Sequence, residues 1–235
     1  MNDYQSMSAW DKLTTTIPLS SSRAAVIKQT YVLFGVSVIS ALAGGYIGAT
    51  SETMVRFFSG WMGWIAAVLL LNAVPRIAIA ARHNPVLGVS ALVLDGFIAG
   101  IALSPLLYFA SLVAPLMILA ALGITGFVFI GVTGYILMSG RTFSAPRGLM
   151  AGMFFALIGA MVLNSFMNIG FLGILISIGI GAMGVCTLVY STSDILSSPD
   201  ADSPIPGALM LFAGVFNIFV ATLNLLLRLF NGRRD

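Results

Sequence analysis

Asp95 is an acidic residue near the middle of an apolar segment that spans residues 86–108. A charged side chain at the centre of a membrane-spanning helix costs about 2.5–3.5 kcal/mol on insertion scales, so we expect Asp95 to face protein or water. Two roles fit such a carboxyl group. It is either a site that exchanges protons or binds cations, or a neutral structural acid that is hydrogen-bonded to a neighbouring helix.

Two asparagines near the C-terminus form a second candidate polar site. Asn217 and Asn224 lie seven residues apart, a spacing that puts both on one face of a helix. Amide side chains in membrane helices commonly form hydrogen bonds between helices, and this is one interpretation of the pair. The other is a polar path for ions.

Other kinds of chemistry find little support in the sequence. His83 is the only histidine and Cys186 the only cysteine, and neither has a partner at metal-ligand spacing. No catalytic triad, phosphate-binding loop or zinc motif is recognisable, so we expect neither an enzyme nor a cofactor. The net charge of +3 comes from scattered arginines, which argues against a nucleic-acid partner.

The composition shows which solvent surrounds these residues. Of the 235 residues, 59% are hydrophobic and only 8% are charged, and the mean hydropathy is +1.03. A soluble domain carries roughly 25% charged residues, so this chain cannot cover a water-exposed surface. We therefore expect a multi-pass protein whose main partner is the lipid bilayer.

Seven apolar segments are each about long enough to cross a membrane as a helix. Backbone groups in lipid must pair internally, and the segments lack the alternation of barrel strands, so we expect an all-α membrane protein. The segments run over residues 26–48, 57–75, 86–108, 113–138, 147–167, 170–190 and 206–230.

The chain divides into one membrane domain, residues 26–230, with a polar segment before it and a short basic tail, residues 231–235, after it. Residues 1–25 contain no apolar core of a signal peptide. Basic residues concentrate in the N-terminal segment and in alternate connections, which predicts a cytoplasmic N-terminus. Seven spans would then place the basic tail outside, unless the last segment re-enters the membrane; we favour seven spans.

Several short motifs occur in an order and spacing that resemble the Bax inhibitor/YccA family. They are Lys28–Tyr31 at the start of the first segment, Gly96–Pro105 in the third, Arg141–Ser144 with Gly148, Asn164–Phe166, Tyr190–Leu196, and Phe216–Phe219. The resemblance covers nearly the whole chain after residue 22. It implies six helices around a central seventh, in a bacterial inner (cytoplasmic) membrane.

The resemblance also implies where a gate would lie. In the calcium-leak members of the family, two aspartates on the sixth and seventh helices share a proton; here the matching positions are Ser191 and Gly214. Asp194 lies about one turn beyond Ser191, and is either a partial substitute or an exposed acid at a helix end. Arg82 is the positional match for a basic residue that latches the closed form.

Loss of both aspartates resembles the YccA branch, whose members associate with the AAA+ membrane protease FtsH and slow proteolysis. The sequence therefore favours a modulator of such a protease. The alternative is a pH-sensitive leak channel for Ca²⁺ or another cation, in which protons act on the gate. A small-molecule transporter is a weaker alternative, because no internal repeat is evident.

Overall fold

In a computed structural model, the structure describes residues 21–139, 143, 147–197 and 203–231. The described residues form helices and no strand, as the composition predicts. Most of the polar N-terminal segment and of the basic tail lie outside the described residues. The helices are α2 (Ser21–Thr50), α3 (Glu52–Ser59), α4 (Trp61–Ala80), α5 (Pro85–Ala102), α6 (Ser104–Val113), α7 (Pro115–Ser139), α8 (Arg147–Met167), α9 (Gly170–Ser197) and α10 (Ile205–Asn231).

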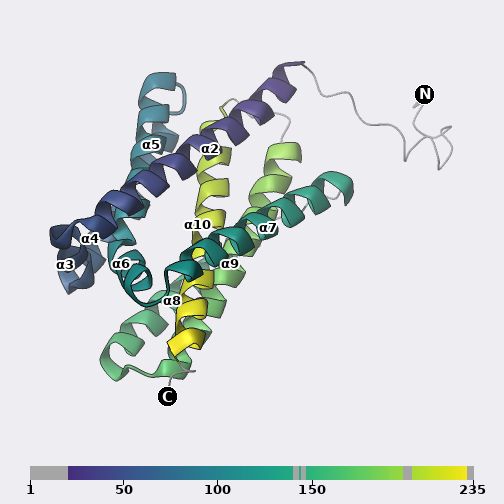
Figure 1. Ribbon diagram of the computed structural model, residues 1–235. Helices are drawn as coiled ribbons and strands as arrows, with labels where there is room; N and C mark the ends of the chain where they lie inside the picture. Colours follow the sequence, from purple (N-terminus) through teal and green to yellow (C-terminus); the bar gives the residue numbers. More distant parts are fainter. Residues whose placement is uncertain (1–20, 140–142, 144–146, 198–202, 232–235) are drawn as a thin grey trace.

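Seven of these helices are long and apolar enough to span a membrane, and α10 is the most buried of the seven. It packs against α9, α7, α2, α4 and α5, and Figure 1 shows it passing behind α2 and α7. The helix α8 packs on α9 and is the most exposed of the spans. The last helix is therefore the centre of the bundle.

Contacts between helices bring the first turns of α2, the α4–α5 turn, the end of α9 and the start of α10 to one end of the bundle. We call this the N-terminal end. The Ser203 hydroxyl donates to the carbonyl of Arg82, so the α4–α5 turn meets the start of α10. A Cβ on Gly207 would touch both Thr30 on α2 and Ile195 on α9. Among the basic residues whose side chains the structure describes, Lys28, Arg76 and Arg82 therefore lie toward this end.

The ends of the second and third spans differ from the sequence prediction. The second span was expected to end at Pro75, but α4 continues to Ala80 with this proline inside it. Proline removes one backbone hydrogen bond, which a membrane helix tolerates when other groups compensate. The third span was expected to reach residue 108, but it ends at Ala102, and the short helix α6 follows after Leu103.

Local capping explains where several helices begin. Ser51 caps α3 by accepting the backbone N–H of Met54. Asn84 caps α5 by accepting from Val86 and Leu87, and Pro85 occupies the first helical position, where its missing N–H costs nothing. The α8–α9 connection contains Asn168 with φ of 49°, a left-handed conformation that asparagine adopts readily.

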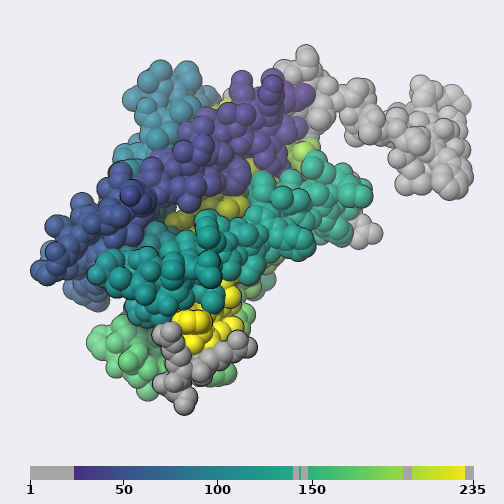
Figure 2. Space-filling view, in the orientation of Figure 1, coloured from purple at the N-terminus to yellow at the C-terminus, as the bar shows by residue number. Residues whose placement is uncertain are grey.

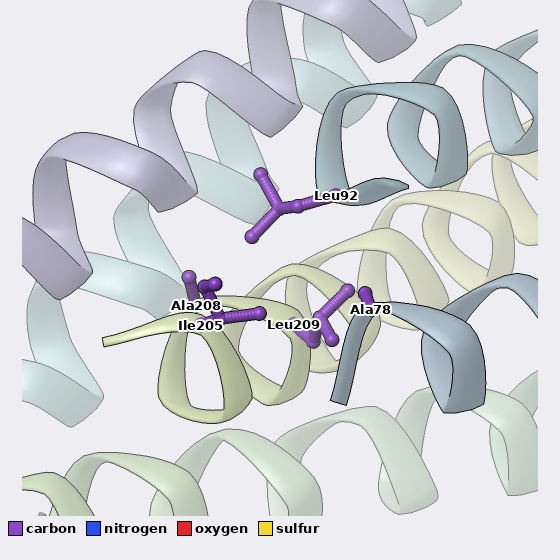
Figure 3. Packing of buried hydrophobic residues seen from close by; sticks show 5 residues of the cluster. All are labelled: Ala78, Leu92, Ile205, Ala208 and Leu209. Atoms are coloured by element: carbon purple, nitrogen blue, oxygen red, sulfur yellow. The ribbon is translucent and has the colours of Figure 1, made fainter. Parts of the chain in front are cut away.

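A hydrophobic cluster joins three helices at the N-terminal end. Leu92 from α5 and Ala78 from α4 meet α10, as Figure 3 shows. The members on α10 are Ile205, Ala208 and Leu209. Gly88 makes room for this contact, because a Cβ there would overlap the side chain of Ile205. The cluster fixes the start of the central helix against α4 and α5.

Candidate functional site

The last two turns of α9 carry a buried run of hydroxyl groups. The sixth span was expected to end at residue 190, but α9 continues to Ser197, so the segment from Tyr190 to Leu196 is helical. Ser191, Thr192 and Ser193 are each no more than 1% exposed. Three consecutive buried residues on a helix must be covered on several sides at once, so this end of α9 is enclosed by its neighbours.

Each hydroxyl in the run meets a different part of the bundle. Ser191 donates to the carbonyl of Leu188 within α9. Thr192 faces the phenol of Tyr31 on α2, although neither oxygen has a well-formed hydrogen bond within the described residues. Ser193 accepts the backbone N–H of Phe143, at 2.6 Å, from the α7–α8 connection. Thr192 and Ser193, which are both neutral, therefore connect α9 to α2 and to the α7–α8 connection.

Gly214 is a close-packing position between α9 and α10, the two helices that pack on each other most extensively among the described pairs. A Cβ built on Gly214 would lie 3.0 Å from the backbone nitrogen of Leu188 and 3.1 Å from the carbonyl oxygen of Gly184. A Cβ on Gly184 would lie 2.9 Å from the carbonyl oxygen of Gly214. The glycines therefore face each other, and their lack of side chains lets the two backbones approach.

The register of this helix pair places Gly214 and Ser191 one turn apart. Gly181 lies against Ala221, Gly184 against Ile218, and Gly207 against Ile195, so the antiparallel register puts Ser191 opposite Leu211. The space beside Gly214 is filled by the backbone of α9. The two positions do not together form a vacant place for two facing carboxylates.

Asp95 lies inside the bundle on α5 and is 5% exposed. Its Oδ1 atom is buried without a hydrogen-bond partner among the described residues. Leu92, one turn earlier on α5, belongs to the cluster that holds the start of α10. Asp95 is thus shielded from lipid by protein, and it belongs to a different helix from the hydroxyl run.

The remaining candidate residues lie outside the hydroxyl run or at its edge. Asn224 donates to the carbonyl of Val220 within its own helix, and Asn217 is half-buried on the same helix. The side chain of Arg82 is exposed and contacts His83, whereas its carbonyl accepts from Ser203. Asp194 is half-buried rather than fully exposed.

The sequence reasoning overlooked two components of this site. Tyr31 was noticed only as part of a motif, and nothing in the sequence pairs it with Thr192. Gly184 belongs to none of the motifs, and its seven-residue spacing from Ser191 is an unspecific signal. Within the described residues, no group of three or more His, Cys, Asp or Glu side chains could hold a metal ion.

A helical bundle with seven membrane-length apolar helices, a central C-terminal helix and a buried polar segment beside it defines a multi-pass α-helical membrane protein. Residues 23–234 match the family described as inhibitor of apoptosis-promoting Bax1. The chain belongs to this Bax inhibitor family, as the sequence motifs predicted.

Relatives of similar length come from several bacteria. A protein of Escherichia coli K12 named modulator of FtsH protease YccA is 29% identical over 204 residues, which cover 86% of this chain and 89% of the relative. An uncharacterized protein of Campylobacter jejuni is 27% identical over 219 residues, with 91% and 92% coverage. An uncharacterized membrane protein of Vibrio cholerae is 26% identical over 204 residues, with 86% and 88% coverage.

Proposed function

We propose that this protein is a non-catalytic regulatory partner of an AAA+ membrane protease of the FtsH type, in a bacterial inner membrane. The observation that carries the proposal is the alignment with the E. coli protein named modulator of FtsH protease, which extends over 86% of this chain. The helix pair α9–α10 supports it, because the two positions that the motif resemblance matches to the family's aspartate pair are buried Ser191 and close-packed Gly214.

Neutral groups at these two positions favour binding over proton-controlled gating. A pair of carboxyl groups shares a proton and so responds to pH. The serine hydroxyl and the glycine have no carboxyl group that could take part in such proton sharing. The hydroxyl contacts of Thr192 and Ser193 join α9 to α2 and to Phe143. In our proposal, these contacts hold one arrangement of the N-terminal end, which serves as the cytoplasmic binding surface together with residues 1–20.

Co-purification from native membranes tests this function. The tagged full chain should recover an AAA+ protease, and its overproduction should slow degradation of a known membrane substrate. A chain lacking residues 1–20 should insert normally but recover less protease. An unrelated seven-helix protein, expressed at the same level, is the control. If the protease is absent while a known substrate is recovered under the same conditions, the proposal fails.

A cation leak channel remains the second candidate, and Asp95 is the observation that favours it. Its Oδ1 atom, which is buried without a hydrogen-bond partner in the described part of the chain, is available for a proton or a cation. Flux of Ca²⁺ and of monovalent cations from vesicles containing the purified chain tests this candidate. Flux equal to that of protein-free vesicles across the neutral pH range would eliminate it.

A further inference from the structure

An apolar pocket of about 370 Å³ opens between α2 and α7. In the space-filling view, part of the central helix α10 is visible between the two (Figure 2). The floor includes Phe212, Val215 and Phe219 of α10, and α5 and α6 complete the walls. The volume lies within the range of about 300–1,000 Å³ that is typical of ligand pockets.

The mouth of this pocket faces the hydrocarbon of the bilayer. Leu42 and Tyr46 on α2 and Leu122 on α7 line the pocket, and they are 53%, 74% and 37% exposed. Both helices are membrane-length spans. Because lipid is the solvent at this level, the molecule most available to the pocket is a membrane lipid.

The distribution of polar groups matches an amphiphile. Thr50 is the last residue of α2, and Ser111 lies near the end of α6. Both hydroxyls donate to carbonyls of their own helices, at Tyr46 and Tyr108. Each hydroxyl oxygen can still accept a hydrogen bond from a ligand without losing the one that it donates. The surface is mostly apolar from there to Phe212.

The lining also excludes one kind of recognition. Among the residues that the structure describes, the lining contains no Lys, Arg, Asp, Glu or His, and Arg56 on the neighbouring helix α3 is paired with Glu52. Within this described part of the chain, an anionic headgroup would therefore find no free cation in the pocket lining. Contact with the hydrocarbon chain, rather than with the headgroup, must provide the binding free energy.

We propose that this pocket binds one acyl chain of a bilayer phospholipid, with the ester end near Thr50 and Ser111 and the chain against α10. The occupied pocket fills the space between α2 and α7 beyond the stacked rings of Phe34 and Phe129. It covers the face of α10 that carries Val215, next to the Gly184–Gly214 contact. This site is independent of the proposed protease interaction, because it lies within the bilayer.

Photo-crosslinking of the wild-type chain is the first test. The full chain is reconstituted with a phospholipid that carries a diazirine near the end of one acyl chain, and adducts are mapped by mass spectrometry. Adducts should be several-fold enriched on lining segments of α2, α6 and α10 relative to α8, which is the most lipid-exposed span. Labelling in proportion to exposure alone would overturn the proposal.

Matched alanine-to-phenylalanine variants provide the second test. Ala49 lines the pocket, and Ala49→Phe should fill it and abolish the lipid that the purified chain retains in native mass spectra. Ala156 is exposed on α8 outside the pocket, and Ala156→Phe should retain lipid as the wild type does. Equal retention by both variants would contradict a specific chain site.

Two further arms distinguish an acyl chain from other ligands. Thr125 is 4% exposed and lines the pocket, so Thr125→Val should leave retention unchanged if a hydrocarbon chain lies beside it. A marked loss would instead indicate a ligand with a polar group at this depth, and the proposal would be wrong. Phosphatidylethanolamine and phosphatidylglycerol should compete equally, whereas tenfold selectivity would indicate headgroup recognition and overturn it.

Discussion

At the scale of single residues, Asp95 distinguishes the two candidate functions better than the hydroxyl run does. Its carboxyl group is enclosed by protein on α5, and one oxygen has no hydrogen-bond partner among the described residues. A buried polar group without a partner costs roughly 1–3 kcal/mol. Two explanations fit a buried carboxyl group with this cost. It has a function in transport, or it has a structural role that depends on its size and polarity.

The Asp95→Asn variant separates these two explanations. We expect normal insertion and an unfolding free energy that is unchanged or higher, because an amide carries no charge to bury. If the protein is a protease modulator, protease recovery should also be unchanged. Thermal unfolding in detergent, co-purification and vesicle flux measure the three outcomes.

The matched control for this variant is Glu52→Gln. Glu52 is a highly exposed acid on α3 whose ion pair with Arg56 should contribute less than about 1 kcal/mol. It tests whether loss of any negative charge alters the assays. Cation flux that is present in the wild type, lost in Asp95→Asn and retained in Glu52→Gln would favour the channel over the modulator.

At the scale of elements, the α9–α10 pair depends on Gly214 for its close approach. We expect Gly214→Ala to destabilise the protein by about 1–3 kcal/mol, because the new methyl group would press on backbone atoms that cannot rotate away. Gly152→Ala on α8 is the matched control, since a Cβ there meets nothing within 4 Å. It should be neutral or stabilising by about 0.5–1 kcal/mol. Chemical unfolding in detergent gives both values.

The same contact bears on any attempt to restore an aspartate pair. The variant Ser191→Asp with Gly214→Asp places a carboxyl group where α9 backbone already lies, so we expect loss of stability and no pH-dependent leak. A stable double variant with pH-dependent calcium flux would mean that the two helices separate easily, contrary to the packing described above.

The sequence predicted the number of spans and the central last helix, because apolar length and the family motifs identify them. It did not predict the break at Leu103, because the residues on both sides are equally apolar, although Pro105 in the first turn of α6 is a helix-start signal. It also missed the contact between Gly184 and Gly214, because helix register depends on three-dimensional packing. The contact between Tyr31 and Thr192 was missed for the same reason, because it also depends on how the helices pack.

At the scale of the whole molecule, the described basic residues are unequally divided between the two ends. Exposed Lys28, Arg76 and Arg82 lie toward the N-terminal end. Arg56, which is paired with Glu52, and exposed Arg228 lie toward the opposite end. By the positive-inside rule, we expect the N-terminal end to face the cytoplasm. This orientation is required for contact between residues 1–20 and the cytoplasmic part of a protease.

Cysteine labelling checks the orientation. In a Cys186→Ser background, a membrane-impermeant thiol reagent should label Ser59→Cys from outside the inner membrane. It should label His83→Cys only after permeabilisation. Both positions are exposed, and they lie at opposite ends of α4. The reverse pattern would invert the topology and remove the proposed binding surface from the cytoplasm.

The early end of α5 has a consequence for the thickness of the surrounding bilayer. Its 18 residues extend about 27 Å, slightly less than a typical hydrocarbon core of about 30 Å, whereas the 28 residues of α9 extend about 42 Å. The long helix must tilt, and the short one must stand nearly upright. The break at Leu103 exposes no backbone, because its N–H donates to Gly100 and its carbonyl accepts from Leu107. Beside α5 the two leaflets should therefore be drawn together, so that this protein thins the membrane on one side only.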